Sequence, residues 1–273
     1  MIIVHKLFSN SILYGRKVIM DYDKLLVMTT SMGSMLLENG AEIYRVEDSI
    51  NLILKAYGVH QSDVFAIPAC IIVTITDSFG HSYTKLLRVV SKGTNLHKMA
   101  MFNNLCRTIC NETPSFEKIY EDIEKINKER QYNFGLQILS RAIIAAAFTL
   151  FYGGTIVDAA CALLCGASIS ITGHNMRRFD TNNFFTNIVS SAVASSIALL
   201  LFHVGIAVNA DKMIIGSFMN LVPGVAITTL MRDMITGDLL AGIAKLTESI
   251  LVGLAIAIGA AIAISLSRVL IGG

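Results

Sequence analysis

Short amphipathic segments make up the first 133 residues of the chain. Apolar side chains recur at every third or fourth position over Lys24–Leu37, which predicts a helix that ends near Gly40. The same spacing over Glu42–Tyr57 predicts a second helix, and Gly58 follows it. Both helices therefore have one face suited to a protein core.

The pattern then changes to β-branched residues. Val64–Ile67, Cys70–Thr76 and Ser82–Val90 are predicted strands, and Asp77–Gly80 is a good hairpin turn between the last two. Two more amphipathic helices are predicted, one over Thr94–Cys110 and one that begins near Pro114. The order αα-βββ-αα predicts an α+β domain over residues 1–133.

From Phe134 to Gly273 the chain is almost continuously apolar. A spanning helix needs about 20 mostly apolar residues. Five segments meet this need, at 134–153, 156–173, 184–204, 213–231 and 239–267, with a loop expected at His174–Asn183. We therefore expect an α-helical integral membrane protein with a five-helix transmembrane domain over residues 134–273.

Charge follows the same division. The chain has 22 Lys and Arg and 20 Asp and Glu residues, and most of them precede residue 134. The formal net charge is only +2, which does not indicate nucleic-acid binding. The residues after Met1 do not resemble a signal peptide. The five cysteines form neither a disulfide framework nor a metal-ligand pattern, so no cofactor or metal is expected.

Lys and Arg near the span ends predict the orientation. Most of them fall on one side if there are five spans, which makes the N-terminal domain cytoplasmic and puts the C-terminus outside. The cytoplasmic set is Lys118, Lys125, Lys128, Arg130, Arg177, Arg178 and Arg232, against Lys212 and Arg268 on the other side.

The fourth expected span contains the sequence Asn220-Leu221-Val222-Pro223-Gly224. Proline removes a backbone hydrogen bond and glycine loosens a helix, and broken helices in transporters expose backbone groups to substrate. Thr228 and Thr229 add polar groups nearby. The alternative is a packing kink, which is common in membrane helices.

Several ionisable residues lie in or near the spans, and such residues are functional candidates. Arg232 and Asp233 fall near the cytoplasmic interface, and Lys245 and Glu248 lie three apart in the fifth span, where they could pair with each other or bind a carboxylate. We assign all four, with Asn220, Pro223, Gly224 and Thr228, to a candidate substrate pathway.

Two further charges stand alone. Asp158 could relay protons or an ion, although an N-cap role near Thr155 fits equally well. Arg141 lies about two turns into the first span, where it could snorkel toward the interface or hold an anionic substrate. The N-terminal domain contains a compact motif made of Gly40, Glu42, Arg45 and Glu47. The alternative to a functional role is an ordinary ion pair on a helix surface.

At two places the sequence resembles the threonine/serine exporter family of bacteria. The first is Gly40-Ala41-Glu42 with Arg45-Val46-Glu47. The second is Leu221–Gly224 followed by Arg232-Asp233, Gly237-Asp238 and Gly242. The resemblance extends over nearly the whole chain, in the short form that has the cytoplasmic domain and one five-span module.

The resemblance implies a non-enzymatic secondary exporter in the inner membrane of a bacterium. The implied cargo is threonine or serine, or a dicarboxylate such as succinate. The implied partner is a small membrane subunit that supplies a second five-span module, although a homo-oligomer would also thicken the wall of the pathway. The alternative functions are a membrane-anchored enzyme or sensor whose cytoplasmic domain carries the activity, and a structural partner of another transporter.

Overall fold

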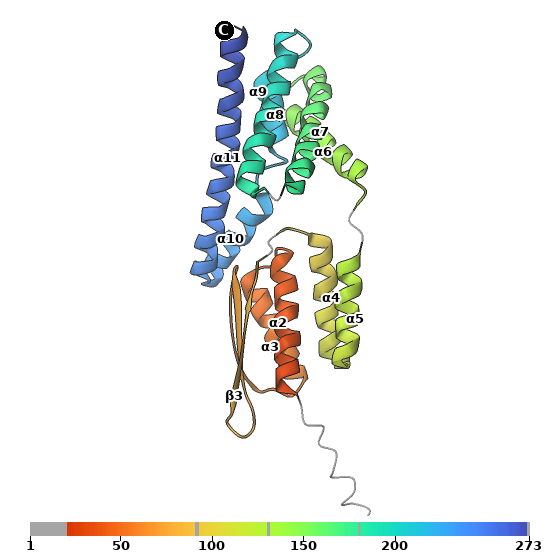
Figure 1. The fold of residues 1–273 in the computed structure, drawn as a ribbon, viewed down its shortest axis with the longest axis vertical. Helices are drawn as coiled ribbons and strands as arrows, with labels where there is room; N and C mark the ends of the chain where they lie inside the picture. Colours follow the sequence, from red (N-terminus) through yellow and green to blue (C-terminus); the bar gives the residue numbers. More distant parts are fainter. Residues whose placement is uncertain (1–20, 91–92, 130–131, 180, 272–273) are drawn as a thin grey trace, which may run out of the picture. The chain divides into compact units, whose positions relative to one another are not determined.

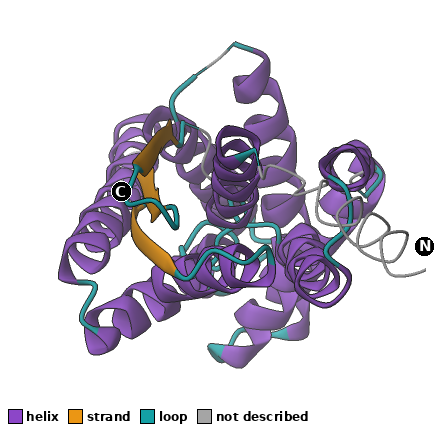
Figure 2. Ribbon diagram, turned by 90° about the horizontal axis from the view of Figure 1, so that it is seen from below, coloured by secondary structure: helices purple, strands orange, loops and turns teal. Residues whose placement is uncertain are grey.

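The computed structural model describes residues 21–90, 93–129, 132–179 and 181–271. The chain divides into two compact units, Met1–Lys128 and Glu129–Gly273. Within the described residues helices dominate both units, and the strands form one small sheet (Figure 2). The start of the chain and Arg130, which entered the arguments on targeting and orientation, lie outside the described residues.

The first unit has three layers. Helices α2 (Tyr22–Glu38) and α3 (Ile43–Ala56) cover one face of an antiparallel sheet in the order β1-β2-β3. The strands are β1 (Gln61–Ile67), β2 (Cys70–Thr76) and β3 (Ser82–Arg88). Helices α4 (Leu96–Glu112) and α5 (Phe116–Lys128) pack on the other side of α2 and α3 (Figure 1).

The middle layer explains an unusual pattern of burial. Helix α2 is buried nearly all round, since it has the sheet on one side and α4 and α5 on the other. Two buried threonines lie on it, and both donate their hydroxyls to helix carbonyls: Thr29 to Leu25 at 2.9 Å and Thr30 to Leu26 at 2.7 Å. These bonds satisfy the hydroxyls inside the core.

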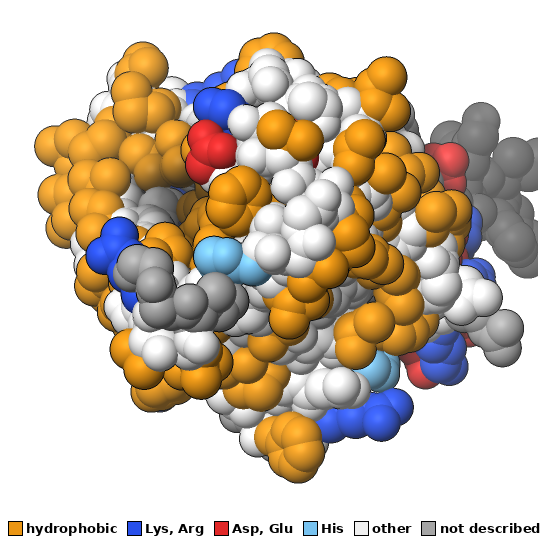
Figure 3. Space-filling view, turned by 90° about the horizontal axis from the view of Figure 1, so that it is seen from above, with side chains coloured by type: hydrophobic (Ala, Val, Ile, Leu, Met, Phe, Trp, Pro, Cys, Tyr) orange, Lys and Arg blue, Asp and Glu red, His pale blue; other side chains and the backbone are white. Residues whose placement is uncertain are grey.

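The second unit is a helical bundle. Its helices are α6 (Phe134–Phe151), α7 (Ile156–Arg178), α8 (Asn183–His203), α9 (Ala210–Phe218), α10 (Gly224–Thr236) and α11 (Leu239–Ile271). Four of them, α6, α7, α8 and α11, are long and apolar enough to cross a membrane. Hydrophobic side chains cover much of the end at which α11 finishes (Figure 3).

Several element ends differ by a few residues from the sequence-based boundaries, among them the start of β1 at Gln61, and two differences in the bundle are larger. The fourth expected span is two short helices, α9 and α10, so four uninterrupted candidate spans are found in the described residues instead of five. The loop expected at His174–Asn183 is mostly helix, because α7 continues through Arg178. Helix α7 is therefore longer than its apolar core.

Glycine lets the helices of the bundle approach closely. A Cβ at Gly166 of α7 would meet the backbone of Arg141 in α6, and a Cβ at Gly259 of α11 would meet Ser191 and Ile188 in α8. A Cβ at Gly216 of α9 would lie 2.9 Å from the carbonyl oxygen of Ala145 in α6. The hydrophobic effect does not drive helices together in lipid, so close packing at small residues stabilises helix association there instead.

Candidate functional site

The backbone is interrupted between α9 and α10, at residues 219–223. Pro223 has no N–H, so the carbonyl of Met219 has no helical donor four residues ahead. The next backbone N–H, that of Gly224, donates to the carbonyl of Val222 at 2.9 Å, so it does not form the helical hydrogen bond to the carbonyl of Asn220. No backbone N–H of residues 219–226 donates to the carbonyl of Leu221 either.

The start of α10 is open as well. Its N-cap, Pro223, makes no side-chain cap bond, and the first N–H group that bonds back to the cap is that of Ile227. The N–H groups of Val225 and Ala226 therefore point out of the helix end without a backbone acceptor in the described residues. The interruption offers carbonyl oxygens on one side and N–H groups with a positive helix end on the other.

Helix α6 lies beside this break. The side-chain amide of Asn220 donates to the carbonyl of Arg141 at 3.1 Å and to that of Ser217 at 3.2 Å. The guanidinium of Arg141 is half-buried, and in the described part of the chain it forms no hydrogen bond or ion pair. Arg177 of α7 is near enough to repel it electrostatically. The break therefore contacts the backbone of a residue that carries an uncompensated cation.

A buried ion pair joins α10 to α11. Lys245 Nζ lies 2.6 Å from Asp233 Oδ2, and the two side chains are 15% and 0% exposed. Gly237 ends α10 with a left-handed φ of 100°, and the chain reverses there into α11. The pair spans this turn, and α10 makes its main contacts with α11. Lys245 thus pairs with an acid on the neighbouring helix.

The remaining pathway residues are distributed along the two helices. Thr228 and Thr229 donate to carbonyls of their own helix, those of Val225 and Ala226, at 2.8 and 3.1 Å. Arg232 and Glu248 are exposed, and Gly224 has nothing within 4 Å of the position its Cβ would take. The break and the Asp233–Lys245 pair lie at opposite ends of α10.

Asp158 accepts five hydrogen bonds. Its Oδ1 accepts from the backbone N–H groups of Val208 and Asn209 at 2.7 and 3.0 Å. Its Oδ2 accepts from the N–H and hydroxyl of Thr155 and from the side-chain amide of Asn209, at 2.8 to 2.9 Å. Thr155 and Asp158 form a capping box at the start of α7. This geometry favours the capping alternative over a proton relay.

The motif in the first unit has structural contacts. Gly40 has a φ of 96°, which a turn between α2 and α3 requires. Glu42 is buried at the N-cap of α3, and Arg45 donates to it at 3.2 Å. Glu47 accepts from the backbone N–H of Ala66 at 2.7 Å, which links α3 to β1.

Sequence reasoning missed two sets of partners. Asn209 and the backbone around it hold Asp158, and nothing in the local sequence indicates a contact about 50 residues away. The pairing of Asp233 with Lys245 could have been predicted from the sequence, because the chain turns at Gly237-Asp238. The two residues lie at equal distances along the sequence from Leu239, which follows this turn. No group of three His, Cys, Asp or Glu residues in the described ranges could hold a metal ion.

Known proteins resemble the chain over most of its length. The family model described as "Putative threonine/serine exporter" matches residues 28–267. The "Threonine/serine exporter" of Corynebacterium glutamicum is 24% identical over 252 residues, which cover 89% of this chain and 51% of the relative. The "Probable threonine/serine exporter" of Mycobacterium tuberculosis is 19% identical over 238 residues, covering 86% and 45%.

The chain thus spans about half the length of the curated relatives it matches. No solved structure matches it. The four apolar helices and the family match together show a membrane protein. Because the family model covers most of the chain, including both motif regions, the protein belongs to the threonine/serine exporter family, as the sequence motifs indicated.

Proposed function

We propose that this chain is a subunit of a secondary exporter of small polar amino acids, with threonine and serine as its cargo. One observation carries the proposal: the helix is interrupted at residues 219–223, and Asn220 at the break donates to the backbone of Arg141, a half-buried residue of α6 whose guanidinium forms no ion pair in the described part of the chain. An anchor for an enzyme or sensor would gain nothing from such a feature, because open backbone groups and buried charges are costly in a membrane. Membership of a transporter family supports the same choice.

The two sides of the break suit the two ends of an amino acid. A carboxylate would accept from the N–H groups of Val225 and Ala226 and from Arg141. An ammonium group would donate to the carbonyls of residues 219–221. The dicarboxylate alternative has one observation in its favour, which is the second cation, Arg177, close to Arg141.

We propose five crossings, with α9 and α10 together forming the fourth. His203 at the end of α8 contacts Ser267 near the end of α11 at 3.1 Å, and Lys212 at the start of α9 lies near Gly154 between α6 and α7. These contacts support a common side of the bundle for the ends of α6, α8 and α11 and the starts of α7 and α9. On the other side Phe134 of α6 stacks near His174 of α7, with ring centroids 4.3 Å apart.

This arrangement supports an orientation. Arg177 and Arg178 lie in the last turn of α7, on the side opposite Lys212 and Arg268. Positive residues mark the cytoplasmic side. We therefore propose that the N-terminal unit is in the cytoplasm of a bacterium, that the bundle lies in the inner membrane, and that the C-terminal end of α11 faces outward.

A partner is part of the proposal. Five crossings form a thin wall, and the relatives carry about as much chain again. We propose that a small membrane subunit with a second five-span module, or a second copy of this chain, completes the pathway. The exposed apolar faces of α6 and α11 offer a binding surface for such a subunit or for a second copy.

The test is export from proteoliposomes that contain the purified chain alone or together with a candidate small membrane subunit of the proposed kind. The vesicles are loaded with radiolabelled threonine, serine, succinate or alanine, and efflux is followed with and without a proton gradient. Efflux of threonine and serine above protein-free vesicles is expected. Efflux of succinate alone would select the dicarboxylate alternative, and no efflux of any cargo with the partner present would refute the proposal.

A further inference from the structure

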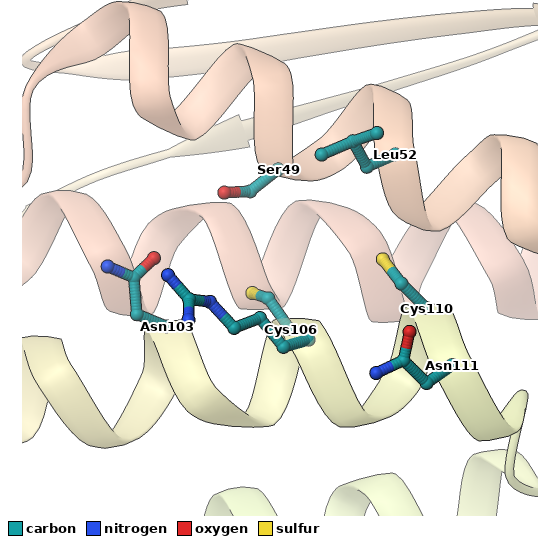
Figure 4. A pocket seen from close by; sticks show the side chains of 7 residues that line it. Ser49, Leu52, Asn103, Cys106, Cys110 and Asn111 are labelled. Atoms are coloured by element: carbon teal, nitrogen blue, oxygen red, sulfur yellow. The ribbon is translucent and has the colours of Figure 1, made fainter.

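The first unit contains a cavity that the transport pathway does not use. It lies between α3 and α4 and has a volume of about 440 Å³, within the range of roughly 300–1,000 Å³ that is usual for small-molecule sites. Figure 4 shows Ser49 and Leu52 on α3 opposite Asn103, Cys106 and Cys110 on α4. Arg107 and Asn111 complete the lining.

The α4 residues of this cavity share one helix face. Positions 103, 106, 107, 110 and 111 follow the i, i+3, i+4, i+7, i+8 spacing of a single helical stripe. Apolar residues at these positions would close α4 against α3. Amides, a guanidinium and thiols stand there instead, so the two helices leave a hollow that has polar groups along its α4 side.

Three of these polar side chains lack partners. In the described part of the chain, Asn103, Arg107 and Asn111 form no hydrogen bond or ion pair. None of the described residues that line the cavity is acidic, so the charge of Arg107 is not neutralised there. Two amides beside an uncompensated guanidinium form a set that can hold a carboxylate and an adjacent hydroxyl or amine.

The two thiols that line the cavity are uncharged at neutral pH. Burial raises the pKa of the Cys106 thiol to about 12, and burial also raises the pKa of Cys110. Both groups therefore stay protonated at neutral pH and are poor nucleophiles. The chemistry of the cavity is that of binding, since it contains no activated nucleophile or base.

We propose that the cavity between α3 and α4 binds a small carboxylate with a neighbouring polar group, specifically a free amino acid, with Arg107 on the carboxylate and Asn103 and Asn111 on the remaining polar atoms. The choice of amino acid rests on the proposed export function, since a cytoplasmic unit meets the cargo before it is exported. Arg107 and Asn111 are exposed to water. Affinity is therefore modest, with a dissociation constant on the order of 1 mM, which suits a sensor of cargo concentration.

The cysteines provide the assay. Full-length protein in detergent is alkylated with iodoacetamide in increasing L-threonine, and the rate at each cysteine is read by mass spectrometry. Threonine is expected to slow alkylation of Cys110, which lines the cavity, without affecting Cys70 on the sheet. Threonine methyl ester, which lacks the carboxylate, should not protect.

Variants locate the contact. Arg107→Gln should raise the half-protecting concentration about tenfold or more, because a charge-assisted bond is lost. Arg88→Gln, an exposed arginine on β3, is the matched control and should leave protection unchanged. Wild-type circular dichroism for Arg107→Gln would show that the unit still folds.

The outcomes are decisive in either direction. Equal protection of Cys70 and Cys110, protection that survives Arg107→Gln, or protection by succinate but not by threonine would each overturn the proposal. The assay needs no gradient and no transport, so it can succeed where the export assay fails, and the two proposals are tested separately.

Discussion

Replacing Asp158 with asparagine tests whether this carboxylate holds the bundle together or carries protons. Its Oδ1 and Oδ2 accept five hydrogen bonds at 2.7 to 3.0 Å, three of them from backbone N–H groups. An asparagine oxygen can still accept from Val208 and Asn209. The amide –NH₂ would then face the N–H of Thr155, which cannot rotate away.

The magnitude follows from that mismatch. At least one hydrogen bond from a backbone N–H to a charged acceptor is lost, and a second donor is brought against it. Bonds to charged groups contribute about 1.5–3 kcal/mol each, so Asp158→Asn should cost about 2–4 kcal/mol of unfolding free energy. Asp211→Asn is the matched control, because its carboxylate is 63% exposed and pairs with Lys212 at the surface, where the cost is below about 1 kcal/mol.

The assay is denaturant-induced unfolding of both variants in detergent, together with threonine efflux as a function of external pH. The structural role predicts a lower unfolding midpoint for Asp158→Asn, with any remaining efflux keeping its dependence on pH. A variant with wild-type stability whose efflux no longer responds to pH would refute this reasoning and restore the proton relay.

Three further predictions concern packing, charge and thiol chemistry. Gly259→Ala should destabilise the bundle by about 1–3 kcal/mol through overpacking against α8, whereas Gly253→Ala on the same helix, with nothing within 4 Å, should be neutral or stabilising in the same unfolding assay. Lys245→Met should cost up to about 3–5 kcal/mol because the buried Asp233 loses its cation, and adding Asp233→Asn should recover most of that loss in a double-mutant cycle; additive losses would contradict the ion pair. Burial raises the pKa of Cys106 from 9.0 to about 12, so the thiolate fraction at pH 8 is about a thousandfold below that of a free thiol. Alkylation of Cys106 should therefore stay slow up to about pH 10 and become faster as the pH approaches 12. Rapid alkylation of Cys106 at pH 8 in the folded protein would contradict its burial.

Local patterns in the sequence predicted most elements but not their ends. Periodicity located the helices from α2 to α5, which are those of the first unit within the described residues, and the turn at Asp77–Gly80, since these depend on neighbouring residues. Hydropathy underestimated α7, because its last turn is polar and continues past the apolar core to Arg178. Hydropathy also merged α9 and α10, because apolar residues continue through the break, which only the residue types Pro223 and Gly224 indicate in the sequence.

The candidate site was predictable in its residues but not in its contacts. Pro223 and Gly224 identified the break from their own conformational properties. The partners of Asp158 and Asp233 depend on the bundle packing, so sequence left the roles of both acids open. The proximity of Arg141 to Asn220 joins residues on α6 and at the end of α9, which pack together through Gly216, and no local pattern encodes it.

Efflux of radiolabelled threonine from loaded cells that produce the chain with Pro223→Ala and Gly224→Leu tests the central claim most directly. The double variant can close the helix between α9 and α10, and a Cβ at position 224 meets nothing within 4 Å. Gly253→Leu, at another open glycine in the bundle, is the control for adding leucine to a membrane helix. The account predicts that the double variant reaches the membrane at the wild-type level and exports no threonine above background, while Gly253→Leu exports normally. Unchanged efflux through the closed helix would contradict the assignment of the break as the substrate site.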